Sequence, residues 1–92
     1  MAMELSDVAR DLLLEASRDP AGLIVRLTAP GGSAYLKANG RAFGDGSPDE
    51  QARWERGARQ LLAFGLVEPH GDRVFCITPE GHVAADVLQG RK

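Results

Sequence analysis

Hydrophobic residues recur along the chain at two spacings, one typical of helices and one typical of strands. After Ser6, a suitable helix N-cap, apolar side chains recur every three to four residues as far as Ala16. Proline disfavours helical geometry in the residue before it, so we expect this first helix to end near Asp19. The apolar, β-branched run at residues 23–28 then predicts a strand.

A second predicted strand, residues 34–38, leads into Asn39-Gly40, the strongest short hairpin signal in the sequence. A two-residue loop at this point would pair Ala38 with Arg41 and place Leu36 opposite Phe43 on one face of the hairpin. Residues 23–44 are therefore predicted to form a small antiparallel meander.

The longest predicted helix begins with a capping box, in which Ser47 is the cap and Glu50 follows three residues later. It is expected to run to about Phe64 and to end at Gly65, where a C-cap glycine lets the chain turn away. One face of this helix is apolar and should be buried: Trp54, Ala58, Leu61 and Leu62.

A strand at 66–68, a turn at 69–72 and a second strand at 74–77 come next. Thr78 followed by proline is typical of a helix start and predicts the last helix. The apolar residues of that helix predict its buried stripe: Val83, Ala84, Val87 and Leu88. The core of the domain is predicted to contain Trp54 with Leu12, Leu61, Leu62, Phe75 and Val83.

Residues 48–88, a helix, a hairpin and a helix, resemble the corresponding part of MarR-like and PadR-like bacterial winged-helix regulators. The resemblance rests on GLVEP at 65–69 and on FCITPEG at 75–81, after a short polar tip. It implies a single α+β, winged-helix-like domain over residues 1–92, in the order α-β-β-β-α-β-β-α. The predicted meander stands where such regulators have the second helix of a helix-turn-helix, so this chain would be a variant.

Composition limits the function in several ways. A chain of 92 residues is one domain, and its formal charge of −2 lacks the basic surplus usual in a dedicated nucleic-acid binder. A single cysteine, Cys76, fits a reducing cytoplasm. The acidic N-terminal segment does not resemble a secretory signal, and no apolar run is long enough to cross a bilayer. We therefore expect a cytoplasmic protein with no membrane partner.

If the long helix enters a DNA groove, Arg53, Arg56 and Gln60 would contact the duplex, and Arg73 at the wing tip would reach a minor groove. The alternative is a solvated helix surface, which the interleaved acidic residues favour: Asp49, Glu50 and Glu55. The meander should also bring three basic residues together, either to bind a partner or only to solvate the sheet: Arg26, Lys37 and Arg41.

Catalytic and metal sites are not indicated. The soft potential ligands His70, Cys76 and His82 lack the paired spacing of a structural zinc site. No serine lies in a nucleophile-elbow sequence, and the glycine pairs lack the residues of a phosphate loop. We expect no cofactor, no metal and no enzymatic activity.

Two functions from different classes remain. The domain is either a DNA-binding transcriptional regulator that binds double-stranded DNA, or a protein–protein interaction module of the same fold that does not bind DNA. Its first and last helices carry more apolar residues than one buried stripe needs, which predicts a homodimer with Leu14 and Val87 as contacts. The alternative to the dimer is a monomer with a few exposed apolar side chains.

Overall fold

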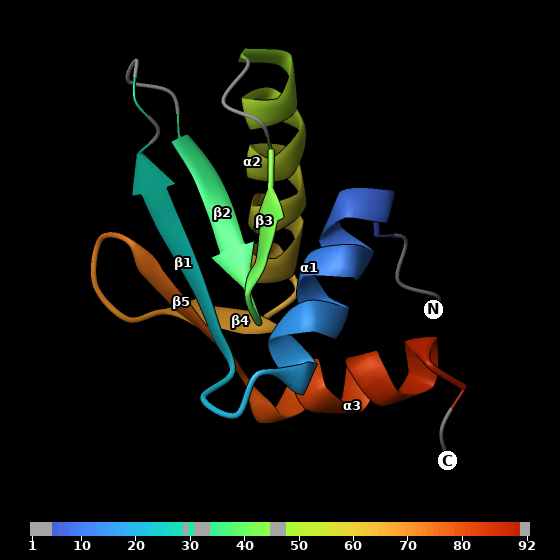
Figure 1. The fold of residues 1–92 in the computed structure, drawn as a ribbon. Helices are drawn as coiled ribbons and strands as arrows, with labels where there is room; N and C mark the ends of the chain where they lie inside the picture. The colour runs from blue at the N-terminus through green and yellow to red at the C-terminus, as the bar shows by residue number, and fades with distance from the viewer. Residues whose placement is uncertain (1–4, 29, 31–33, 45–47, 91–92) are drawn as a thin grey trace.

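A computed structural model of the chain describes residues 5–28, 30, 34–44 and 48–90. Within these ranges the elements are α1 (Asp7–Arg18), β1 (Leu23–Thr28), β2 (Ala34–Ala38), β3 (Arg41–Phe43), α2 (Pro48–Ala63), β4 (Val67–Pro69), β5 (Val74–Ile77) and α3 (Pro79–Leu88). The fold is α+β, and its elements follow one another in the predicted order (Figure 1).

The strands form one antiparallel sheet in the order β3-β2-β1-β5-β4. The predicted meander and the predicted wing hairpin are therefore parts of the same sheet. They are joined where β1 pairs with β5, with Leu23 opposite Cys76 and Val25 opposite Val74. This long-range pairing leaves no trace in local sequence periodicity.

The hairpin between β2 and β3 confirms the predicted register. Asn39 and Gly40 both have positive φ, at 51° and 80°, as the tight primed turn requires. Leu36 lies opposite Phe43 and Ala38 opposite Arg41. The turn chemistry of two residues was sufficient to set this pairing.

Most of the predicted helix ends are confirmed. The Ser6 side chain accepts from the Ala9 amide, and the Thr78 side chain accepts from the Gly81 amide. At the end of α2, Gly65 has φ +70° and its amide donates to the Leu62 carbonyl, while the Leu66 amide donates to the Leu61 carbonyl. These two bonds are a Schellman ending. Ser47, and with it the predicted capping box, lies outside the described residues.

The core lies between the three described helices and one face of the sheet (Figure 1). The prediction is confirmed for Leu12, Leu61 and Trp54, whose side chains are buried, with Trp54 only 3% exposed. Leu62 and Phe75 lie at its edge and are partly buried. The strands contribute alternate residues to it: Ile24, Ala34, Leu36, Ala38, Phe43, Val67 and Ile77.

The predicted buried stripe of α3 was largely wrong. The helix buries Gly81, Ala84 and Ala85. The larger residues face solvent: Val83 is 64% exposed, Val87 70% and Leu88 39%. The physical reason is the close approach of α3 to the rest of the domain. A Cβ atom on Gly81 would overlap the Leu66 carbonyl oxygen, so only the small-residue side of α3 fits there.

Candidate functional site

The predicted DNA-contacting residues of α2 differ in whether their side chains already have polar partners. Arg53 lies 3.5 Å from Glu50, measured between Nη1 and Oε1. Gln60 accepts a 2.8 Å hydrogen bond from the Ser6 amide through Oε1, so it holds the start of α1 against α2. Arg56 is exposed and makes no ion pair among the described residues. Of these three, only Arg56 has no polar side-chain contact with another described residue.

Arg73 does not lie with the other predicted DNA contacts. It lines a polar pocket of about 370 Å³ with Arg26, Thr28, Ala34, Gln51 and Asp72. Arg53 and Arg56 line a different pocket, of about 260 Å³, together with Ser6, Asp49 and Ala52. Arg73 therefore lies apart from Arg53 and Arg56, and the predicted DNA contacts form no single cluster.

Arg59 was not singled out from the sequence, although its position is more accessible than that of Gln60. It is exposed and lines a groove of about 190 Å³ with Arg26, Trp54, Glu55, Ala58, Leu62 and Phe75. Like Arg56, it has no ion pair in the described ranges. Its position three residues after Arg56 was the available signal, because residues at that spacing are neighbours on a helix surface.

The predicted basic face of the meander was wrong. Arg26 is on the helix side of the sheet, 5.6 Å from the centre of the Trp54 ring and 3.8 Å from Glu55 Oε1. Arg41 is also on the helix side, because it pairs with the buried Ala38 across the hairpin. Lys37 pairs with Val25 and points to the opposite face. Arg26 and Arg41 lie opposite Leu36 and Ala38, the two neighbours of Lys37 on β2, so strand alternation puts Lys37 on the other face.

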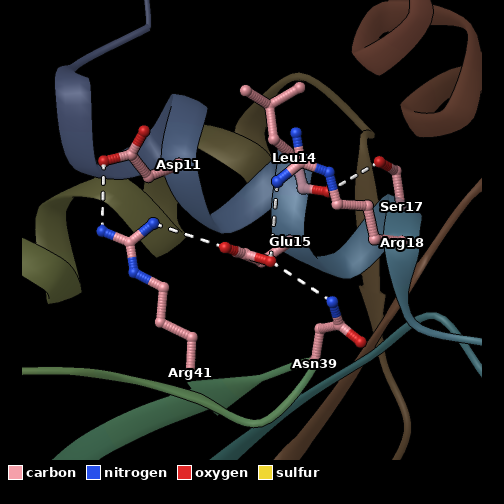
Figure 2. A network of polar contacts seen from close by, with 7 residues as sticks. All are labelled: Asp11, Leu14, Glu15, Ser17, Arg18, Asn39 and Arg41. Atoms are coloured by element: carbon pink, nitrogen blue, oxygen red, sulfur yellow. Dashed lines mark hydrogen bonds and ion pairs between the residues drawn. The ribbon is translucent and has the colours of Figure 1, made fainter.

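Arg41 instead belongs to a polar network that ties α1 to the hairpin (Figure 2). Its guanidinium lies 3.4 Å from Glu15 Oε2 and 3.8 Å from Asp11 Oδ2. Glu15 also accepts a 3.3 Å hydrogen bond from the Asn39 amide nitrogen, and its side chain is only 14% exposed. Arg18 lies 3.8 Å from the same carboxylate. These contacts supply hydrogen-bond donors and positive charge to a carboxylate that packing has partly removed from water. The role of the network is therefore structural.

The three potential soft metal ligands also lie apart from one another. His70 Nε2 lies 3.2 Å from Glu68 Oε1 in the turn region of the β4–β5 hairpin. The Cys76 sulfur lies 3.8 Å from the Ala21 carbonyl oxygen, and His82 is exposed on α3. No group of three or more His, Cys, Asp or Glu side chains within the described part of the chain could hold a metal ion. Nor is any described helix long and apolar enough to cross a membrane.

The outward face of α3 is the clearest feature that sequence analysis misplaced. Val83 and Val87 are one turn apart and both are mostly exposed. His82 and Asp86, also exposed, border them on one side. Leu14, the other predicted dimer contact, is partly buried and packs against the core. The face thus presents two adjacent apolar side chains that no described residue covers.

Comparison with protein-family models, with curated proteins and with solved structures finds no match to this chain. The resemblance to winged-helix regulators accordingly stays a prediction.

Proposed function

We propose that this domain is a non-enzymatic protein-interaction module that binds a partner protein through the outward face of α3. The observation that carries the proposal is the exposure of Val83 and Val87, 64% and 70%, on a helix whose buried side consists of small residues. Adjacent exposed apolar side chains on one helix face are typical of a surface that a partner covers.

The position of α3 favours this use. Its inner side is held by the Thr78 cap and by the close contact between Gly81 and the Leu66 carbonyl, so the helix is a rigid support for its outer side. A rigid surface loses little conformational entropy on binding. The partner surface that fits is an apolar groove or helix, with polar groups at its rim facing His82 and Asp86.

The test compares proteins captured by the wild-type chain with those captured by two matched variants. Val87→Asp places a charge in the centre of the proposed surface, whereas Ala52→Asp places the same charge on the exposed side of α2. We expect a partner that binds the wild type and Ala52→Asp but binds Val87→Asp at least about tenfold more weakly, a change of about 1.4 kcal/mol. Partners that Val87→Asp retains at full affinity would contradict the proposal.

DNA binding is the second candidate function, supported by one specific observation. Arg56 and Arg59 on α2 and Arg73 in the β4–β5 turn are exposed, and none of them makes an ion pair among the described residues. Against this candidate stand the pairing of Arg53 with Glu50 and of Arg26 with Glu55, together with a net charge of −2. These features leave little accumulated positive charge to attract phosphates.

A fluorescence-anisotropy titration with mixed duplex fragments at low salt tests this candidate. If DNA binds, Arg56→Ala should weaken the complex and reduce the dependence of log affinity on log salt by about one unit, because one phosphate contact is lost. Lys37→Ala, on the sheet face away from α2, is the control and should leave binding unchanged. No binding at tens of micromolar protein would eliminate DNA as a ligand.

A further inference from the structure

The sheet has a second face that the described helices do not cover. Strand register places apolar side chains together on this face: Leu23, Val25 and Leu27 of β1, Tyr35 of β2, and Val74 and Cys76 of β5. All six are partly exposed and none belongs to the buried core, whereas most alternate residues of the same strands do: Ile24, Ala34, Leu36, Ala38 and Ile77. In Figure 1, α1 and α2 lie on one side of the sheet, and α3 runs past its lower end. We call this surface the open face.

The open face is slightly hollowed along β1. A shallow groove of about 330 Å³ follows Leu23, Val25 and Leu27 and is bordered by two charged residues, Lys37 and Asp19. An antiparallel sheet can expose one face to water, but that face is then normally polar. Here β1 and β5 carry an apolar residue on this face at every described position. This composition is typical of a sheet face that packs against another surface.

Opposite charges flank the apolar strip. Lys37 lies on β2, directly opposite Val25, and makes no ion pair in the described ranges. Glu68 lies on β4, directly opposite Cys76, and its Oε1 lies 3.2 Å from His70 Nε2 in the neighbouring turn. Both side chains are exposed. The open face therefore runs from a positive strand, across two apolar strands, to a negative strand.

We propose that the occupant of the open face is a second copy of this chain, packed sheet to sheet around a two-fold axis that runs between β1 and β5. That axis places β1 of one copy over β5 of the other, and β2 over β4. Lys37 then lies over the strand that carries the partner's Glu68, and the same contact forms twice. The two residues are offset by two positions along the strands, about 7 Å, a distance that two long side chains bridge between sheets about 10 Å apart.

The charge pattern is the argument for a second copy over an unrelated protein. A face that is positive at one side and negative at the other is complementary to itself after a two-fold rotation. On this axis Cys76 of β5 would face the larger Leu23 of β1, and Val74 would face Val25, so apolar side chains of both strands would meet between the packed sheets. This interface is separate from the outward face of α3 and does not depend on the proposed function of that helix.

Sedimentation velocity across a range from about one to several hundred micromolar tests the proposal. We expect the 9.8 kDa chain to form a dimer in this range. Val25→Asp, Lys37→Glu and Glu68→Lys should each weaken the dimer at least about tenfold, because the first buries a charge and the others oppose like charges. The double variant Lys37→Glu with Glu68→Lys exchanges the charges and should restore the dissociation constant to within about threefold of wild type.

Val87→Asp is the matched control, because it introduces the same charge on α3 and should leave the dimer intact. Circular dichroism confirms folding of every variant; should Val25→Asp unfold, the exposed Lys37 and Glu68 variants decide the question. A monomer at every concentration would overturn the proposal. So would a dimer that Val87→Asp dissociates while Lys37→Glu does not, or a double variant that remains as weak as the single ones.

Discussion

Replacing Gly81 by alanine tests the close packing of α3, because the packing predicts a loss of stability where helix propensity alone predicts a gain. In an exposed helix interior, glycine to alanine stabilises by about 1 kcal/mol through helix propensity. At Gly81 the added Cβ would overlap the Leu66 carbonyl oxygen and would come within 2.6 Å of Ile77 Cγ1. The isoleucine can change rotamer, but the carbonyl is held by a 3.0 Å hydrogen bond from the Thr78 amide.

The substitution therefore has to displace α3 or break that hydrogen bond. Overpacking in a close-packed site costs about 1–3 kcal/mol, and a lost backbone hydrogen bond adds about 1 kcal/mol. After subtraction of the propensity gain, we expect Gly81→Ala to lower the free energy of unfolding by about 2 kcal/mol. For a domain of this size the melting temperature should then fall by roughly 8–16 °C.

Urea and thermal denaturation followed by circular dichroism measure both quantities. Val83→Ala is the matched control, because it lies on the exposed side of the same helix and gains helix propensity without a new contact. Its melting temperature should stay constant or rise slightly. A Gly81→Ala protein at least as stable as the wild type would refute the packing argument.

Three further substitutions test other parts of the fold. Trp54→Ala should cost about 3–5 kcal/mol and unfold much of the protein. Trp54→Phe should cost less than half of that, because it also removes the buried Nε1 donor, which has no hydrogen-bond partner among the described residues. Thr78→Val should cost about 2 kcal/mol, since the hydroxyl both caps α3 and donates to the Gly65 carbonyl at 2.7 Å; Thr78→Ser keeps both bonds and should lose under 1 kcal/mol. Glu15→Gln should cost less than about 1 kcal/mol, because the arginines it contacts are half exposed; a loss above about 2 kcal/mol in the same denaturation assays would show that the network in Figure 2 contributes more than solvated ion pairs do.

Local chemistry was sufficient to predict much of this protein. Ser6 and Thr78 cap their helices, Gly65 ends α2 in the left-handed conformation, and Asn39-Gly40 sets the register of its hairpin. Each of these features depends on residues within a few positions of one another, so the local sequence is sufficient to predict it. For the same reason the order of helices and strands could be predicted along the entire chain.

The faces of the elements were harder to predict, because a face depends on what lies opposite it. Hydrophobicity assigned Val83 and Val87 to the core, but the approach of Leu66 to Gly81 turned the small side of α3 inward. Gln60 was grouped with the arginines of α2, yet its distance from α1 allows it to bind the Ser6 amide. Neither contact has a local signature.

Pairing between distant segments was likewise decided only by the tertiary structure. The hydrogen bonds between β1 and β5 unite the meander with the wing hairpin and create the open face from residues of both. Strand alternation can assign Val25 and Val74 each to a face of its own strand. Whether those faces coincide depends on register between strands about fifty residues apart, which is set by packing of the whole core and not by the residues nearby.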